Sequence, residues 1–257
     1  MTMFDIHTHI LHGIDDGASD LEQMLLMARD AASQHITGVI ATPHHADGHH
    51  WNPGERIRRL TDEANAALRA ANIPLTIYPG QEVRIYNRLL EDLEEKIVLT
   101  LNDSRYLLLE LPHSHIPRET ADMIYELQLM GIVPIIAHPE RNLEIARDPR
   151  RLLELVQTGA LAQVTSHSII GHSGKKVKQI AMDLCKHRLI HLMASDAHNR
   201  SLRNFNLDTA CEAIVDTLGQ DFRDYYTANA SSVMNDQPIE VWPADARMRK
   251  KFFFFGR

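Results

Sequence analysis

Histidine side chains stand at the end of the first apolar segment of this chain. His7 and His9 are two positions apart and directly follow the segment Met3 to Ile6. Side chains at positions i and i+2 of a β-strand point to the same face, so we expect the two imidazoles to reach one metal ion together. Because a single pair of this kind is common by chance, the interpretation depends on whether later segments repeat the pattern.

Five further apolar segments end in groups that bind metal ions. Only the segment that ends at Thr165 lacks such a group, and its neighbour His167 is assigned a substrate contact at most. Asp15 and Asp16 compete for one role in the loop after the first segment, and Asp16 is favoured. The predicted ligands are five imidazoles and four carboxylates, namely His7, His9, His44, His138, His198, Asp16, Glu82, Glu110 and Asp196.

The size and chemistry of this set indicate more than one metal ion. A catalytic zinc site uses about three protein ligands and a water molecule, so nine groups serve at least two ions, or three if carboxylates bridge. Two divalent ions neutralise the four carboxylates, and a third leaves a positive charge that suits an anionic substrate such as a phosphate ester. Imidazole and oxygen ligands without thiolate favour manganese (Mn²⁺), with iron or zinc as alternatives.

The apolar segments alternate with longer amphipathic ones, as in a β/α fold. Strands are predicted at residues 3–6, 37–41, 74–78, 105–110, 132–137, 161–165 and 189–194. Helices are predicted at 19–34, 55–71, 118–130, 149–158, 173–187 and 206–218, with only a short helical segment after residue 220. This order favours a closed, parallel, seven-stranded (β/α)7 TIM-like barrel over an open doubly wound sheet. In such a barrel, functional groups gather at the carboxyl ends of the strands.

Composition narrows the class of protein. The 257 residues are 44% hydrophobic and 24% charged, which fits one large α/β domain, predicted at 1–240, and a basic and aromatic tail at 241–257. A net charge of -7 disfavours nucleic acid as a partner. The amino-terminal segment has neither the basic region nor the apolar stretch of a signal peptide, so we expect a cytoplasmic protein. We expect Cys185 and Cys211 to be reduced structural thiols.

Six motifs, in order along residues 5–198, resemble those of the polymerase and histidinol phosphatase (PHP) family. They are His-Thr-His, Thr-Pro-His-His, Gly-Gln-Glu, Leu-Glu-Leu-Pro, Ala-His-Pro-Glu-Arg and Ser-Asp-Ala-His. Asp15-Asp16-Gly17 and His138-Pro139-Glu140-Arg141 are most similar to the bacterial manganese-dependent tyrosine phosphatases of capsule and exopolysaccharide synthesis. The resemblance implies a distorted seven-stranded barrel with three metal ions and the nine ligands above. It also implies that Arg141 and Arg203 bind phosphate, with Arg200 as the rival of Arg203, and it places Asp196 among both the ligands and the catalytic residues.

The implied reaction is hydrolysis of phosphotyrosine monoesters by a metal-activated water molecule. A cysteine-dependent mechanism needs an arginine six residues after the nucleophile, but His191 and Thr217 stand at those positions after the two cysteines. The expected substrate is a tyrosine-phosphorylated bacterial protein kinase. The tail suggests peripheral association with the inner face of the membrane, directly or through that partner. Alternatives are a small-molecule phosphatase of the histidinol phosphate type, a phosphodiesterase, and a non-enzymatic metal-binding module.

Overall fold

The strands of the protein all run parallel in the computed structural model, which describes residues 3–245. The strands are β1 (Met3–Thr8), β2 (Ile36–Ala41), β3 (His44–His45), β4 (Thr76–Pro79), β5 (Glu82–Arg84), β6 (Tyr106–Glu110), β7 (Val133–Ala137), β8 (Leu161–Thr165) and β9 (Leu192–Ala194). The helices are α1 (Leu21–Ser33), α2 (Gly54–Ala70), α3 (Leu89–Glu94), α4 (Thr120–Leu129), α5 (Leu143–Arg147), α6 (Arg150–Gln157), α7 (Ser166–Ile170), α8 (Lys175–Lys186), α9 (Leu207–Leu218) and α10 (Gln220–Met234), with short 3₁₀ turns η1 (Leu101–Asp103) and η2 (Pro139–Arg141).

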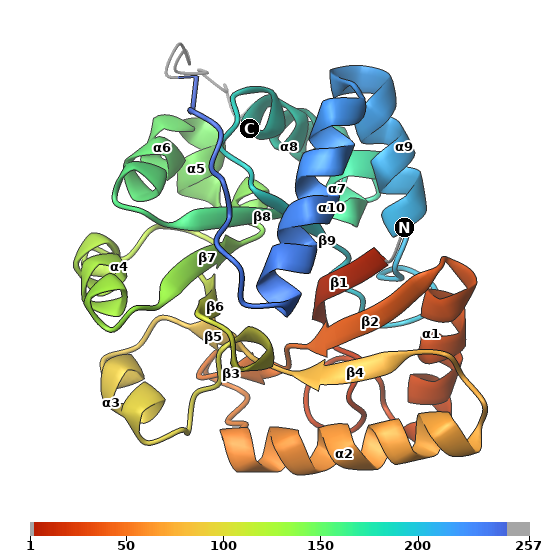
Figure 1. Ribbon diagram of the computed structural model, residues 1–257. Helices are drawn as coiled ribbons and strands as arrows, with labels where there is room; N and C mark the ends of the chain where they lie inside the picture. The colour runs from red at the N-terminus through yellow and green to blue at the C-terminus, as the bar shows by residue number, and fades with distance from the viewer. Residues whose placement is uncertain (1–2, 246–257) are drawn as a thin grey trace, which may run out of the picture.

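The strands form a distorted ring. Hydrogen bonding divides them into a sheet of order β1-β2-β4 and a sheet of order β3-β5-β6-β7-β8-β9. β3 continues β2, and β5 continues β4, after two intervening residues in each case. The nine short strands therefore correspond to the seven strands, or staves, of one barrel (Figure 1). The last stave meets the first through an isolated bridge between Thr8 and Ala197 and a hydrogen bond from His9 N to Ala197 O of 2.8 Å. The predicted parallel α/β fold is confirmed, and its strands are interrupted between β2 and β3 and between β4 and β5, and pair weakly where the first and last strands meet.

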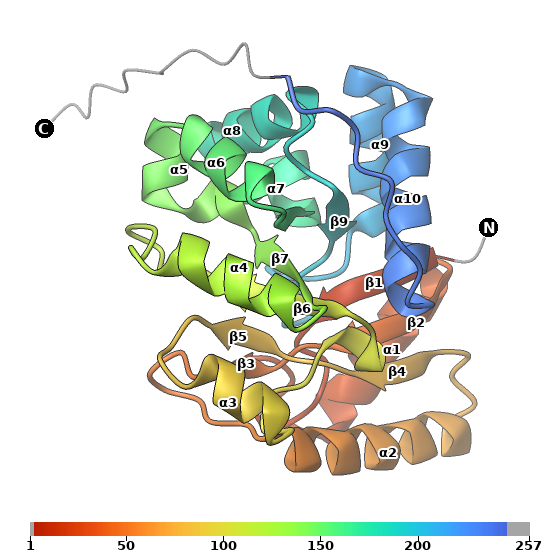
Figure 2. The ribbon, with the colours of Figure 1, turned by 60° about the vertical axis from the view of Figure 1, so that its left-hand side comes forward.

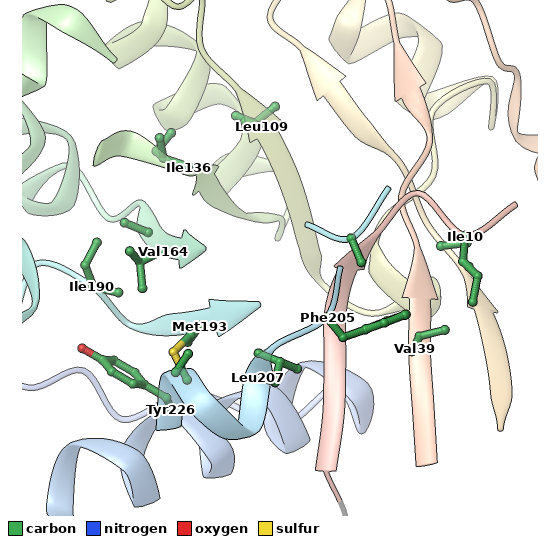
Figure 3. Close-up of a cluster of buried hydrophobic side chains, with 14 of the residues drawn as sticks. Ile10, Val39, Leu109, Ile136, Val164, Ile190, Met193, Phe205, Leu207 and Tyr226 are labelled. Atoms are coloured by element: carbon green, nitrogen blue, oxygen red, sulfur yellow. The ribbon is translucent and has the colours of Figure 1, made fainter. Parts of the chain in front are cut away.

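Alternating side chains of the strands build two apolar clusters. On β6, Tyr106 and Leu108 belong to the inner cluster, whereas Leu107 and Leu109 belong to the larger cluster beneath the helices. Figure 3 shows this outer cluster, in which Leu109 and the corresponding side chains of β7, β8 and β9 point to the same side of the strands. This period-2 alternation with both faces buried is typical of a parallel sheet covered by helices.

The last helix, α10, closes one end of the inner cluster. Its residues Ala230, Val233 and Met234 pack with the apolar interior of the barrel. The side chain of Asn229 donates to the carbonyl of His191 at 2.8 Å, just before β9. Figure 1 shows α10 beside β1 and β9. The sequence predicted only a short helical segment here, which is wrong, because polar residues such as Asn229 on the buried face interrupt the apolar periodicity.

Helix α1 begins at a side-chain cap. Asp20 accepts a hydrogen bond from Gln23 N at 2.9 Å, which satisfies one of the free N–H groups of the first turn. Figure 2 shows α3 and α4 on the outside of β5, β6 and β7.

Within residues 3–245, no helix is both long and apolar enough to span a bilayer.

The boundary of the predicted tail lies at the edge of the described chain. Trp242 stacks on Tyr225 of α10 with 4.1 Å between ring centroids, and Asp245 N donates to His187 O at 2.9 Å. Residues 241–245 therefore pack against the barrel. The basic and aromatic residues from 246 to 257 lie outside the described residues, so the prediction for the tail stays a prediction.

Candidate active site

The structure brings all nine predicted ligand residues together at one end of the barrel. They form four overlapping groups, in each of which the candidate ligand atoms lie within 4.8 Å of one another. The groups are His9, Asp16, His44 and His198; His7, His9 and Glu82; His7, His138 and Asp196; and His44, Glu82 and Glu110. Since every one of the nine residues belongs to at least one group, residues separated by up to 191 positions along the chain (from 7 to 198) converge on a single site.

Two buried carboxylates, Glu82 and Asp196, lie at the centre of the site. Glu82 Oε2 is 3.4 Å from both His7 Nε2 and His9 Nε2, and Asp196 Oδ1 is 3.3 and 3.4 Å from the same two nitrogens. Glu82 also lies 3.0 Å from His44 Nδ1 and 2.7 Å from His138 Nε2. Glu82 thus faces imidazoles from several strands, whereas Asp196 faces the two imidazoles at the end of the first strand.

Unpaired polar atoms indicate that this site fits metal ions. Among the described residues, Glu82 Oε2, Asp196 Oδ1, His44 Nδ1 and His198 Nε2 are buried without a hydrogen-bond partner. Burial of a polar atom without a partner costs about 1–3 kcal/mol, and four such atoms directed at one small region are unusual in a purely structural network. A cation coordinated by these lone pairs removes the cost. The donor set of nitrogen and oxygen atoms without thiolate suits a divalent transition-metal ion.

The charges of the site prepare its carboxylates for this role. Burial alone would raise the pKa of Glu82, but His7 and two further imidazoles outweigh it and hold that pKa well below its usual range. For Asp196, the Arg141 guanidinium and nearby imidazoles likewise outweigh burial and lower the pKa. Burial and the charge of His9 lower the pKa of His198 to about 4. The carboxylates are therefore ionised and the His198 imidazole is neutral at pH 7, as ligation requires.

The structure distinguishes between the two competing aspartates. Asp16 Oδ1 lies 3.2 Å from His198 Nε2 and 3.4 Å from His44 Nε2, so its carboxylate is among the candidate ligands. Asp15 lies behind them, with its Oδ2 2.7 Å from His9 Nδ1 and 3.1 Å from His44 N. A carboxylate that accepts the Nδ1 proton of an imidazole fixes the ring and leaves Nε2 free to bind metal. Asp15 thus orients the candidate ligand His9, whereas Asp16 is itself among the candidate ligands.

Two further residues orient the predicted ligands and were not among the predicted site residues. Gln163 of β8 points its Oε1 at His7 Nδ1 at 2.9 Å, and Arg84 of β5 contacts Glu110 Oε2 at 2.7 Å. The signal for Gln163 was its polar side chain inside an otherwise apolar strand. Contacts between side chains 156 residues apart, such as Gln163 and His7, have no local sequence signature.

Two arginines stand beside the metal-ligand cluster. Arg141 donates to Asp196 Oδ2 at 2.7 Å and to Thr165 Oγ1 at 3.3 Å, and Arg203 donates to the same Asp196 oxygen at 2.9 Å. Arg200 instead pairs with Asp30 on the surface at 2.6 Å. The structure therefore places Arg203, rather than its rival Arg200, next to the site.

A cavity of about 220 Å³ lies above the ligand cluster, and both arginines line it. His44, Glu110 and His138 of the ligand cluster also line it, together with His113 and apolar residues. The cavity therefore offers cationic groups beside the candidate metal ligands, which is the charge pattern expected for a phosphoryl group.

A sequence family matches most of the chain. A family model described as "Capsular polysaccharide synthesis, CpsB/CapC" matches residues 3–235. The chain belongs to the CpsB/CapC family. The branch that the motifs resembled, a bacterial family of capsule synthesis, is thereby confirmed.

Named relatives in the CpsB/CapC family cover the chain almost completely. The tyrosine-protein phosphatase YwqE of Bacillus subtilis is 42% identical over 253 residues, which is 98% of this chain and 100% of YwqE. The putative tyrosine-protein phosphatase CapC of Staphylococcus aureus is 35% identical over 257 residues, 98% of this chain and 99% of CapC. The tyrosine-protein phosphatase CpsB of Streptococcus pneumoniae is 28% identical over 92% of this chain and 100% of CpsB.

Solved structures support the same assignment. A chain from a study of YwqE and CpsB, described as unique metal-dependent tyrosine phosphatases, has a TM-score of 0.94 and 42% identity, covering 96% of this chain and 100% of that one. A phosphotriesterase homology protein from Escherichia coli has a TM-score of 0.55 at 11% identity and covers 90% of this chain and 97% of that one. The second likeness concerns the fold alone.

Three other residues considered in the sequence, His167 and the two cysteines, do not line the candidate active site. His167 is buried and its Nε2 lies 3.1 Å from Asn204 Oδ1, without lining the 220 Å³ cavity. Cys185 and Cys211 are buried free thiols, and burial raises their pKa to about 12 and about 11. Neither sulfur is thus a thiolate at neutral pH, which agrees with the predicted structural role of both cysteines.

Proposed function

We propose that this member of the CpsB/CapC family is a metal-dependent protein-tyrosine phosphatase that hydrolyses phosphotyrosine monoesters. The observation that carries the proposal is the convergence of nine metal-ligand side chains beneath a cavity lined by two arginines. The tyrosine phosphatases YwqE and CpsB, which match nearly all of the chain, support the substrate class.

The proposed ligands are the nine clustered residues, and the proposed ions are two or three Mn²⁺, with iron or zinc as the alternatives. When bound, such ions neutralise phosphoryl oxygens and make a water molecule acidic enough to attack at neutral pH. Glu82, which faces His7 as well as His44 and His138, and Asp196, which faces His7, would hold these ions together with the imidazoles.

The chain's own residues bind and orient the ester. Arg141 and Arg203 present guanidinium groups to the cavity and are placed to hold non-bridging phosphoryl oxygens by charge-assisted hydrogen bonds. Their present partner, Asp196 Oδ2, keeps both side chains extended toward the site. Thr165 and the buried Glu140 in turn hold Arg141 in place, since Glu140 Oε1 accepts from Thr165 Oγ1 at 3.0 Å.

The leaving group explains why aryl esters are the favoured substrates. A tyrosine phenolate has a pKa of about 10 and leaves without strong protonation, whereas a serine alkoxide is far more basic. Among the described residues, the carboxylate that lines the cavity is Glu110, and its Oε2 is paired with Arg84 at 2.7 Å, so the lining offers no free acid to protonate an alkoxide. The architecture therefore fits phosphotyrosine better than phosphoserine.

The test is a substrate panel on metal-stripped protein to which each metal is added back. We expect Mn²⁺ to restore hydrolysis of p-nitrophenyl phosphate and of a phosphotyrosyl peptide, with much slower turnover of histidinol phosphate and of a phosphodiester. Metal analysis should find at least two ions per chain. Equal rates on alkyl and aryl esters would favour the small-molecule phosphatase, and inertness toward every ester would favour a binding module.

The physiological substrate in this proposal is a tyrosine-phosphorylated bacterial protein kinase of capsule synthesis, and the proposed location is the cytoplasm. The description of the family as one of capsular polysaccharide synthesis supports this pairing. Incubation of the phosphorylated kinase with metal-loaded protein should remove its phosphotyrosine signal, and the Arg141→Ala protein should not. Membrane recovery before and after deletion of residues 246–257 tests the proposed peripheral association.

A further inference from the structure

A second cavity, of about 360 Å³, adjoins the candidate active site. It lies between η2, α5 and α8, and Figures 1 and 2 both show α5 and α8 close together on the same side of the barrel. His113 and Arg141 line this cavity as well as the 220 Å³ active-site cavity. The two cavities therefore adjoin at these residues, and one ligand can occupy both.

The walls of this side cavity are aliphatic. Leu143 and Ala146 come from α5, and Val177 and Ile180 come from α8. In each pair the residues are three positions apart, so they share one face of their helix, and the two faces meet across the cavity. Apolar walls of this size beside a highly charged site favour a ligand that combines an anionic group with a hydrophobic one.

Hydrogen bonds fix the segment that contains His113, one of the two residues that line both cavities. The side chain of Asn142 donates to the carbonyls of Pro112 and His115 at 2.8 and 2.9 Å, and Leu143 N donates to His113 O at 2.8 Å. The segment 112–116 is therefore fixed to the start of α5. A wall that is already ordered costs little conformational entropy when a ligand binds.

The rim of the side cavity carries positive charge. Arg141, Arg147 and Lys176 line it, and the latter two are exposed. The acidic lining residue, Glu140, is buried and accepts hydrogen bonds from Thr165 N and Oγ1 through Oε1. Because the chain as a whole has a net charge of -7, this basic rim is a local feature, and it complements acidic residues of a ligand.

We propose that the side cavity binds an apolar side chain that lies within two residues of the phosphotyrosine of an acidic phosphopeptide. The inference rests on the proposed function and adds the substrate's sequence preference to it. An extended peptide advances about 7 Å over two residues, and the two cavities adjoin at His113 and Arg141, so we place the apolar side chain within this reach of the phosphotyrosine. Leu143, Ala146, Val177 and Ile180 contact the apolar side chain, and Arg147 and Lys176 attract the flanking acidic residues.

The first measurement is a comparison of phosphotyrosyl peptides on the metal-loaded protein. In an otherwise constant acidic peptide, leucine is placed in turn at the two positions before and the two after the phosphotyrosine, and serine at the same positions serves as the reference. We expect leucine at one position to raise kcat/KM about tenfold, mainly through KM, since filling an apolar pocket discriminates by about this factor. Replacing the acidic residues of the peptide by lysine should lower kcat/KM relative to the acidic peptide with the same leucine position.

The second measurement assigns the preference to the cavity. Val177→Asp places a charge on its wall, and Gln179→Asp places the same charge on an exposed position of the same helix as a matched control. Leu143→Ser is a second variant on the opposite wall. We expect the leucine preference to fall below about twofold in Val177→Asp and in Leu143→Ser and to persist in Gln179→Asp, while all variants hydrolyse p-nitrophenyl phosphate like the parent protein.

A binding readout separates recognition from turnover. A peptide with a non-hydrolysable phosphonate in place of the phosphate should lose about tenfold in affinity for Val177→Asp relative to Gln179→Asp, as measured by fluorescence anisotropy. Circular dichroism shows whether each variant is folded. Because Val177→Asp and Leu143→Ser alter opposite walls, one of them still tests the inference if the other does not fold.

The outcomes distinguish this inference from the function beneath it. If the parent protein hydrolyses no phosphotyrosyl peptide with any metal, the proposed function is wrong and the inference with it. If it hydrolyses them with no leucine preference at any position, or if the preference survives both Val177→Asp and Leu143→Ser, only the inference is overturned. A dimer that Val177→Asp dissociates, with the peptide preference unchanged, assigns the cavity to contact between copies and also overturns it.

Discussion

Replacement of Asp15 by asparagine tests whether a residue that is not itself a ligand sets the metal affinity of the site. Asp15 Oδ2 lies 2.7 Å from His9 Nδ1 and 3.1 Å from His44 N, and its Oδ1 accepts from Gly17 N at 3.0 Å. Asparagine is nearly the same size, but only one of its two terminal atoms accepts hydrogen bonds. If the amide oxygen keeps the backbone contact of Gly17, the amide nitrogen faces the Nδ1 proton of His9.

The expected loss follows from that mismatch. The His9 ring loses a charge-assisted hydrogen bond and no longer has a fixed Nε2 lone pair for the metal. Removal of such a supporting carboxylate typically weakens metal binding by about 10- to 100-fold, which is about 1.4–2.7 kcal/mol. Because the nine candidate ligands themselves stay in place, excess metal should restore turnover.

The assay is a titration of metal-stripped protein with Mn²⁺, followed through hydrolysis of p-nitrophenyl phosphate. The half-saturating concentration should rise about 10- to 100-fold in Asp15→Asn, with a nearly normal rate at saturation. Asp30→Asn is the matched control, because Asp30 pairs with Arg200 on the surface at 2.6 Å and should leave both values unchanged. An unaltered half-saturating concentration in a folded Asp15→Asn protein would refute the orienting role.

Three further predictions concern the phosphate site, the pH dependence and the first loop. Arg141→Ala should lower kcat about 100- to 1,000-fold with full metal content, whereas Arg200→Ala should retain normal turnover; a fully active Arg141→Ala protein would make its ion pair purely structural. Although burial opposes it, Asp15 and neighbouring carboxylates hold the pKa of His9 well above 6.5 without metal. That proton stabilises the metal-free fold below pH 6.5 and is lost as the pH rises through the higher value, so calorimetry should show metal affinity increasing from about pH 6 to about pH 8, and a flat profile would contradict this. Gly17→Ala should lower the free energy of unfolding in urea by about 1–3 kcal/mol, since the new Cβ would lie 2.0 Å from His9 O, and unchanged stability would show that the loop adjusts freely.

The architecture was predictable because the period of the apolar pattern changes regularly between strands and helices. The predicted strands at 105–110, 132–137 and 161–165 correspond within one residue to β6, β7 and β8. The short strands β3 and β5 were not predicted, because two or three residues carry no period. They are recognisable only in space, as continuations of β2 and β4 around the ring.

The convergence of the site was predictable from one rule, and its details were not. Parallel strands of a barrel end at the same rim, so His7, Glu110 and Asp196 were expected to meet, and they do. The supporting contacts of Asp15 and Gln163 depend on side-chain directions that only the folded chain defines. A shift of register in β1 between Asp5 and Thr8 has the same origin, because it is set by pairing with β2.

The meeting of the first and last strands has a consequence for the newly made protein. His7 and His9 are synthesised early, but Asp196 and His198, which complete two of the three candidate metal-binding groups that contain His7 or His9, are synthesised almost two hundred residues later. A chain that stops before residue 196 lacks two of the four candidate groups and keeps the two that consist of residues up to Glu110. The complete candidate site therefore assembles only when the last strand has been made.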